Sequence, residues 1–141
     1  MTQRATPYLW FRDDAEAAAA WYAELFCGRV VATSRAGDAV IAVTVEVLGL
    51  RLVLLNGNRD QPFTDAFSLQ VPCEDQAEID RLWAALTAEG GREGRCGWLK
   101  DRFGVSWQVV PADLPSLLAN PRAVPVMLGM RKLDWAALAS A

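Results

Sequence analysis

Two stretches decide the fold: Asp13-Asp14-Ala15-Glu16 through to Gly28, and Asp75-Gln76-Ala77-Glu78 through to Gly90. In each stretch an Asp is followed three residues later by a Glu, a capping box that predicts the start of a helix. A glycine, which accepts a left-handed backbone, ends each predicted helix. The matching pairs are each 62 residues apart: Asp13 and Asp75, Glu16 and Glu78, Trp21 and Trp83, Gly28 and Gly90. This constant offset indicates an internal duplication.

Strand-like segments surround both predicted helices in the same order. The helices have apolar faces at helical spacing, made of Trp21, Tyr22, Leu25 and Phe26 in the first and Ile79, Leu82, Trp83 and Leu86 in the second. One short apolar strand precedes each helix, Tyr8–Phe11 and Phe67–Val71. The strands predicted after the helices are Arg29–Ser34, Val40–Leu48, Leu52–Leu55, Gly94–Leu99 and Val105–Val110, with a turn at 101–104 between the last two.

The predicted fold class is α+β. We expect two βαβββ modules, about 6–57 and 65–111, that form a curved mixed sheet within one domain of residues 1–120. Residues 121–141 form a C-terminal helical tail of the same domain, after a short helix at Asp113–Leu118. The amphipathic segment Val126–Leu138 either packs on its own domain or clasps a second copy in a homodimer.

Composition excludes several classes of function. The net charge is -3, from 14 Lys+Arg against 17 Asp+Glu, so no basic face for nucleic acid is expected. Asp13 and Asp14 interrupt any signal peptide, and no segment approaches the ~20 apolar residues of a membrane span. The cysteines, Cys27, Cys73 and Cys96, are odd in number, which favours free, mostly buried thiols and a cytoplasmic location.

The sequence resembles the PhnB-like family of the vicinal oxygen chelate superfamily, which includes glyoxalases, bleomycin-resistance proteins and dioxygenases. The resemblance covers nearly the whole chain, and its most specific part runs from Cys96 to Pro111. It is carried by Tyr8–Phe11, Leu55–Gly57, Phe67–Val71, Cys73-Glu74, Cys96–Asp101, Gly104–Pro111 and Met130–Asp134. The resemblance implies the paired βαβββ fold and a homodimer. Members are often described as similar to a demethylubiquinone methyltransferase, but the chain lacks the glycine-rich turn and parallel sheet that such an enzyme usually needs.

The superfamily implies a divalent metal held by His, Glu or Gln from the first and last strands of each half. Alternation along a strand predicts which positions share the cavity face: Thr6, Tyr8, Trp10, Leu54, Asn56, Ala66, Ser68, Gln70, Ser106 and Gln108. The chain contains no histidine, and amides with hydroxyls bind Zn, Ni or Fe weakly. A carboxylate site for Mg or Mn would depend on Glu46, whose facing is open. We therefore expect neither a metal nor another cofactor.

The expected site is a pocket for a small apolar or aromatic molecule. Its predicted residues are Trp10, Asn56, Ser68, Gln70, Trp98, Lys100 and Gln108. Trp107 and Gln108 must face opposite ways, and Gln108 is chosen as the one that lines the cavity. The alternatives are a metal-dependent lyase, isomerase, dioxygenase or thiol transferase, and a drug-sequestering homodimer. Whether the chain is an enzyme, and which residues would be catalytic, stays open.

Three further features bear on the candidate site. Lys100, Asp101 and Arg102 form either a solvated turn with a weak ion pair or a lid that meets an anionic substrate through Lys100 or Arg102. Cys96 has no histidine to activate it as a nucleophile. Cys73, just before the second helix, is the better candidate for a reactive thiol.

Overall fold

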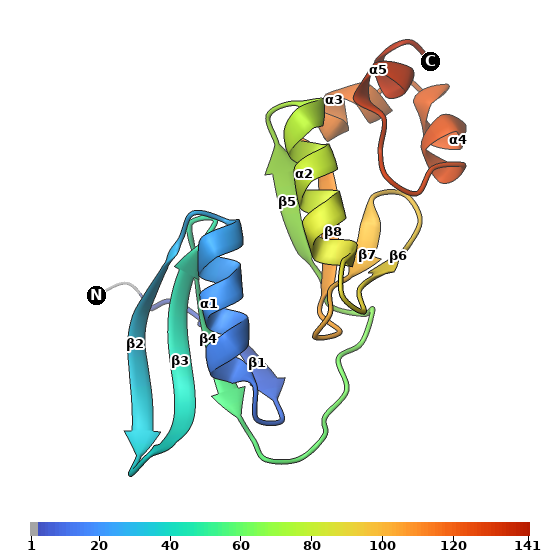
Figure 1. Ribbon diagram of the computed structural model, residues 1–141. Coiled ribbons are helices and arrows are strands. Elements are labelled where there is room, and N and C mark those ends of the chain that lie inside the picture. The colour runs from blue at the N-terminus through green and yellow to red at the C-terminus, as the bar shows by residue number, and fades with distance from the viewer. Residues whose placement is uncertain (1–2) are drawn as a thin grey trace. The chain divides into compact units, whose positions relative to one another are not determined.

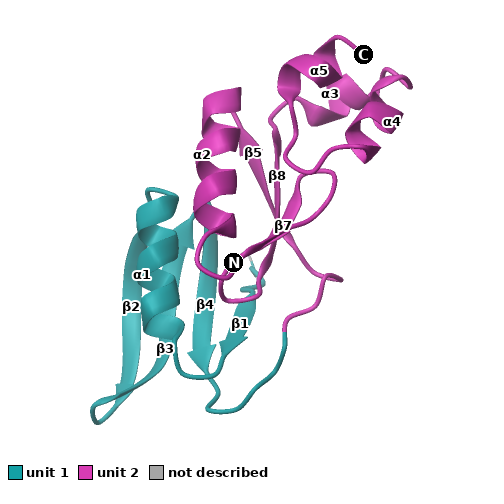
Figure 2. Ribbon diagram, turned by 45° about the vertical axis from the view of Figure 1, so that its right-hand side comes forward, with its two compact units in different colours: residues 1–62 teal, residues 63–141 magenta. Residues whose placement is uncertain are grey.

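The computed structural model describes residues 3–141. The chain forms two compact units, the first ending at Pro62 and the second beginning at Phe63 (Figure 2). Each unit has its own four-stranded sheet.

The first unit is a βαβββ module (Figure 1). Its strand order is β1-β4-β3-β2, with β1 parallel to β4 and the other pairs antiparallel. Helix α1 lies on one face of this sheet. The elements are β1 (Tyr8–Phe11), α1 (Ala15–Leu25), β2 (Arg29–Ala36), β3 (Ala39–Val47) and β4 (Leu50–Asn56).

The second unit repeats this module. Its strand order is β5-β8-β7-β6, again with the first strand parallel to the last and the other pairs antiparallel. The duplicated α+β plan predicted from the 62-residue offset is therefore confirmed. The elements are β5 (Leu69–Cys73), α2 (Gln76–Thr87), β6 (Arg92–Glu93), β7 (Trp98–Lys100) and β8 (Ser106–Pro111). Strand β5 begins two residues later than predicted, so Ser68 directly precedes it.

The two helices begin in different ways. The Asp75 side chain accepts a hydrogen bond from Glu78 N at 2.8 Å, and the Glu78 carboxylate accepts one from Glu74 N, as the capping box predicts. Helix α1 has no such cap on its own segment, since Asp14 makes no side-chain cap bond. Instead Asn56 Oδ1, at the end of β4, accepts from Ala15 N at 2.9 Å. The capping box predicted at Asp13 is wrong.

The end of α1 also differs from the prediction. Cys27, not Gly28, has the left-handed backbone, with φ of 52°. Gly28 is required for a different reason, because a Cβ there would overlap the Glu46 carbonyl oxygen and the Val47 side chain on β3. The close approach of the chain to β3 therefore explains this glycine.

Each sheet buries one face under its helix. In the first unit, alanines and Tyr22 supply the buried side of α1, whereas the predicted Trp21 is only half-buried. In the second unit, Trp107 of β8 is completely buried. The principal buried apolar residues are Leu9, Phe11, Val43, Val45, Leu52 and Leu54 in the first unit, and Val71, Ile79, Leu82, Leu86, Leu99 and Val109 in the second.

The C-terminal tail packs on its own unit. It contains α3 (Leu114–Leu118), α4 (Ala123–Leu128) and α5 (Trp135–Ala139), so the amphipathic segment predicted over 126–138 is two short helices with a loop between them. Leu133 and Leu138 join a buried cluster with Val110. The Gln76 amide at the start of α2 also bonds Leu133 O and Trp135 N. Among residues 3–141, no helix is long and apolar enough to cross a membrane.

The three cysteines are free, as predicted, but only Cys73 is buried. Burial, followed by the charge of Glu78, raises the pKa of the Cys73 thiol from 9.0 to about 12. The thiolate, which is the nucleophile, is therefore suppressed. The prediction that Cys73 is the better candidate for a reactive thiol is wrong, because its side chain is completely buried at the end of β5.

Asn56→Leu is expected to lower the free energy of unfolding by about 1–3 kcal/mol, because Ala15 N–H and Val40 O would lose their partner. Urea denaturation measures this. Gln61→Leu, at an exposed amide of the connector, is the control and should change stability little. Equal effects of the two substitutions would contradict the bridging role of Asn56.

Iodoacetamide is expected to alkylate Cys27 in the native protein and to spare Cys73, because Cys27 is exposed and Cys73 is buried. Mass spectrometry of the treated protein measures this.

The raised pKa of Cys73 also predicts that the free energy of unfolding falls as pH rises above about 9, because the unfolded chain then loses a proton that the folded chain retains up to about 12. Urea denaturation from pH 8 to 11 measures this fall. Cys73→Ala should show a shallower fall, and an identical pH profile would refute this assignment.

Candidate functional site

The face of the second sheet that is opposite α2 carries a group of polar side chains around one tryptophan. The strand register places Gln108 of β8 directly between Gln70 of β5 and Trp98 of β7. Trp98 and Gln108 are half-buried, and Gln70 is exposed. Because Trp107 is buried on the α2 side, its neighbour Gln108 faces away from α2, as alternation predicted.

Hydrogen bonds join the polar side chains into a chain. Gln70 Nε2 donates to Gln108 Oε1 at 3.3 Å, and Gln108 Nε2 donates to Ser68 Oγ at 2.9 Å. This direction leaves the Ser68 hydroxyl hydrogen as a donor at one end and the Gln70 carbonyl as an acceptor at the other. The chain can therefore present a donor and an acceptor to a molecule on this face.

Lys100 belongs to a second polar group on the same face. Its Nζ lies 3.1 Å from Asp65 Oδ1, and Ser106 Oγ donates to the same oxygen at 3.0 Å. The bond to Lys100, followed by the bond to Ser106, lowers the pKa of Asp65. Nothing in the sequence marks Asp65, because it lies in the connector and meets Lys100 only when the sheet forms.

The turn after Lys100 is built around a buried carboxylate. Asp101 is 2% exposed and accepts bonds from Phe103 N at 2.8 Å, Val105 N at 3.1 Å and Trp107 Nε1 at 2.8 Å. The reading of residues 100–102 as a solvated turn is therefore wrong for Asp101. Arg102 makes an ion pair with Glu89. Asp101 fixes the hairpin that presents β7 and β8, and its own side chain is not available to a ligand.

Two predicted site residues belong to the first unit, and they lie on opposite faces of its sheet. Trp10 pairs with Leu55, whereas Asn56 pairs with Phe11 and bonds Ala15 of α1. The expectation that Asn56 shares the cavity face with Trp10 is wrong. Leu55, not Asn56, is the β4 residue that pairs with Trp10, so the Asn56 side chain lies on the face covered by α1. Trp10 Nε1 donates to Arg59 O at 2.9 Å, and the Arg59 guanidinium lies 5.3 Å from its ring centroid.

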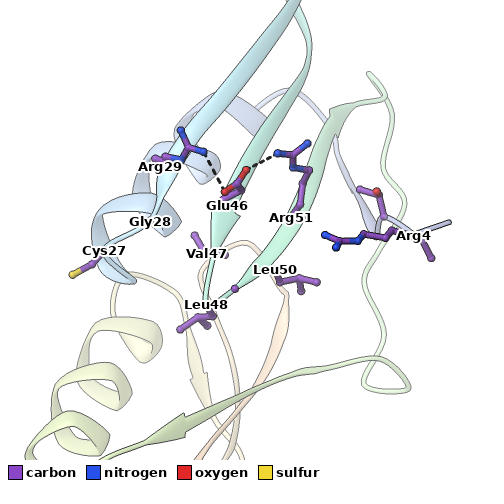
Figure 3. A pocket seen from close by; sticks show the side chains of 12 residues that line it. Arg4, Cys27, Gly28, Arg29, Glu46, Val47, Leu48, Leu50 and Arg51 are labelled. Atoms are coloured by element: carbon purple, nitrogen blue, oxygen red, sulfur yellow. Dashed lines mark hydrogen bonds and ion pairs between the residues drawn. The ribbon is translucent and has the colours of Figure 1, made fainter. Parts of the chain in front are cut away.

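Each unit has a hollow, but only that of the second unit lies beside the predicted site residues. In the second unit a hollow of about 440 Å³ is lined by Asp65, Arg92, Glu93, Gly94, Arg95, Trp98, Leu99, Lys100 and Ser106. In the first unit a larger one, of about 720 Å³, lies at the ends of β2, β3 and β4 (Figure 3). There Glu46 bridges Arg51 and Arg29, with oxygens 2.6 and 3.4 Å from their nitrogens, and the bond from Arg51 is the main cause of its lowered pKa.

The side chains of these faces do not fit a divalent metal site. The chain has no histidine, and residues 3–141 contain no group of three or more Cys, Asp or Glu side chains that could hold an ion. Gln108 already uses both ends of its amide on Gln70 and Ser68. Glu46, the acid considered for Mg or Mn, is held between two arginines.

Comparisons with known proteins agree with this architecture. Residues 3–110 match the family described as 3-demethylubiquinone-9 3-methyltransferase. A PhnB protein from Bacillus cereus, described with the same methyltransferase name, has 30% sequence identity and a TM-score of 0.69, over 77% of this chain and 99% of that one. No curated protein matches the chain.

More distant structures show the fold alone. A protein from Pseudomonas aeruginosa has 22% identity and a TM-score of 0.66, over 78% of this chain and 98% of that one. A glyoxylase/bleomycin resistance protein/dioxygenase domain from Frankia has 16% identity and a TM-score of 0.55, over 79% and 93%. The chain therefore belongs to the PhnB-like family, described as 3-demethylubiquinone-9 3-methyltransferase, and has the glyoxalase-like fold.

Proposed function

We propose that this chain binds a small planar apolar or aromatic molecule on the open face of the second sheet, without a catalytic metal. The observation that carries the proposal is the position of Trp98 beside the hydrogen-bonded chain of Gln108, Gln70 and Ser68. Small-molecule sites combine apolar walls with a few polar groups that fix orientation. This face has both within three neighbouring strands.

Trp98 supplies the apolar wall. Its ring is half-buried, since Leu99 and not Trp98 fills the core beneath β7. A half-buried indole leaves part of its surface for a second ring, and aromatic pairs stabilise each other by about 0.5–1.5 kcal/mol beyond area burial. A flat ligand therefore gains more from this position than a branched aliphatic one.

The polar chain supplies orientation. A ligand that offers an acceptor near the Ser68 hydroxyl and a donor near the Gln70 carbonyl would satisfy both ends of the chain. A ligand that offers neither a donor nor an acceptor there would leave the Ser68 hydroxyl and the Gln70 amide unpaired wherever it displaces water, and an unpaired buried polar group costs about 1–3 kcal/mol. Polar groups at these positions therefore favour a ligand with its own polar groups over a purely apolar compound.

The sheets of this chain do not favour methyl transfer, the activity in the family's description. Methyl transfer from S-adenosylmethionine usually depends on an open parallel sheet with a glycine-rich turn. Each sheet here has one parallel pair and two antiparallel pairs. The neutral amides and hydroxyls around Trp98 likewise suit binding better than Lewis-acid catalysis.

Uncharged 2-naphthamide is a suitable probe, because it combines a flat apolar ring with one amide. Isothermal titration calorimetry is expected to show binding that Trp98→Leu weakens about threefold to tenfold, since the leucine keeps an apolar side chain but removes the ring contact. Trp135→Leu, at a half-buried tryptophan of α5, is the matched control and should leave affinity unchanged.

Two outcomes would contradict this proposal: absence of binding by the intact protein, or equal affinity of both variants. A requirement for added Zn²⁺, Ni²⁺ or Mn²⁺, or stoichiometric thermal stabilisation by one of them, would contradict its metal-free part.

We also propose that the chain forms a homodimer, with no nucleic-acid partner. Exposed apolar side chains on α4, Val124, Val126 and Leu128, support a self-contact, and the net charge of -3 disfavours phosphate backbones. Multi-angle light scattering is expected to give about twice the 15.4 kDa chain mass. A monomer mass at micromolar concentration would refute the dimer.

A further inference from the structure

We propose that the hollow beside Trp98 binds the anionic group of the ligand, so that the ligand class is an aromatic or other planar carboxylate. This inference rests on the proposed function and makes its site more specific. Three cationic side chains carry it: Arg92 on β6, Arg95 in the following turn and Lys100 on β7.

Strand register brings two of these cations to the same face as the tryptophan. Arg92 pairs directly with Lys100, and Lys100 lies two residues after Trp98 on β7. Residues two apart on a strand point to the same side, so the ring and both cations face one way. A ligand whose ring lies on Trp98 would therefore place a ring substituent near Arg92 and Lys100.

The β6–β7 connection is held closely against Trp98. Gly94 N donates to Trp98 O at 2.8 Å, and Trp98 N donates to Arg95 O at 3.0 Å. A Cβ at Gly94 would lie 2.7 Å from Trp98 O, closer than real contacts allow. The backbone that carries Arg92 and Arg95 is therefore fixed relative to the ring, which reduces the ordering cost of binding.

The charges around the hollow do not cancel. Among residues 3–141, neither Arg92 nor Arg95 forms an ion pair. Glu93 accepts a bond from Trp83 Nε1 at 2.8 Å on the α2 side and lies 3.8 Å from Arg131. Two negative charges line the hollow beside the three cations: Asp65, which pairs with Lys100, and Glu93. The surplus of positive charge next to an apolar ring fits a carboxylate attached to a planar group.

The larger hollow of the first unit lacks this combination. Its glutamate lies between two of its three arginines, and none of its twelve lining residues is aromatic (Figure 3). Exposed ion pairs of this kind contribute little to stability and mark no ligand by themselves. The hollow of the second unit is therefore the better candidate for an aromatic anion.

Asp65 has a definite role in this arrangement. The Asp65 carboxylate pairs with the Lys100 ammonium group, and a ligand carboxylate would compete with it for that group. Ser106, 2% exposed, holds the Asp65 carboxylate through its hydroxyl. Removing the charge of Asp65 should therefore strengthen binding of an anion, an effect opposite to that of removing Lys100.

The test compares 2-naphthoate with 2-naphthamide, two probes of the same shape that differ in charge. Calorimetry at low salt is expected to show a preference of about fivefold to tenfold for the carboxylate, from two exposed charge contacts. Arg92→Gln and Lys100→Gln should each reduce this preference, and Asp65→Asn should raise affinity for 2-naphthoate about twofold to fivefold. Arg122→Gln, an exposed cation outside the hollow, is the control.

Each result separates the inference from the function on which it rests. Equal binding of the two probes, or a preference unchanged by Arg92→Gln and Lys100→Gln, overturns the anionic subsite and leaves the aromatic site standing. Binding of neither probe overturns both. A circular dichroism spectrum of each variant identifies loss of folding, and weaker 2-naphthoate binding by a folded Asp65→Asn variant counts against the competition with Lys100.

Discussion

The alternation of side chains along the strands, with one helix on each sheet, is the constraint on which the structure depends. A single helix can cover only one face of a four-stranded sheet, so alternate residues become core and the rest face away from it. On β8 this rule buries Trp107 under α2 and leaves Gln108 on the other face. On the second face the C-terminal tail buries Val110 at the end of β8, whereas Gln108 and Trp98 stay half-buried, and the candidate site lies at those two residues.

The buried side of each module is fixed by polar contacts as well as apolar ones. Asp101 satisfies two backbone N–H groups and the Trp107 indole, and thereby joins the hairpin turn to the core. In the first unit the Asn56 side chain, at the end of β4, bonds both Ala15 N at the start of α1 and Val40 O on β3. An unpaired buried polar group is costly, so these contacts specify one register of each sheet.

The chemistry of the open face follows from the kinds of side chain that occupy it. The neutral side chains of Gln70 on β5, Gln108 on β8 and Ser68 just before β5 bond one another, whereas the Ser106 hydroxyl bonds the Asp65 carboxylate. Neutral groups of this type orient a ligand and do not strongly activate it. The nearby charges are confined to the β6–β7 hairpin and Asp65, at one side of Trp98. The hydrogen-bonded amides and the Ser68 hydroxyl are thus separate from the charged side chains, an arrangement in line with the selective binding proposed above.

The sequence by itself determined the repeated module, most of the strand and helix order and the choice of Gln108 over Trp107. These depend on local signals, namely periodicity, glycine positions and alternation, which act within a few residues. The sequence missed β6 (Arg92–Glu93) and placed one strand over Gly94–Leu99, where the structure has a turn followed by β7. It predicted the cap of α2, where Asp75 and Glu78 are neighbours, and failed at α1, where Asn56 reaches Ala15 across 41 residues. Only the tertiary structure decided that Asn56 and Trp10 lie on different faces of the sheet, that Cys73 is buried and that Asp65 pairs with Lys100. Those facts depend on which distant strands pair and in what register, and no local pattern encodes that pairing.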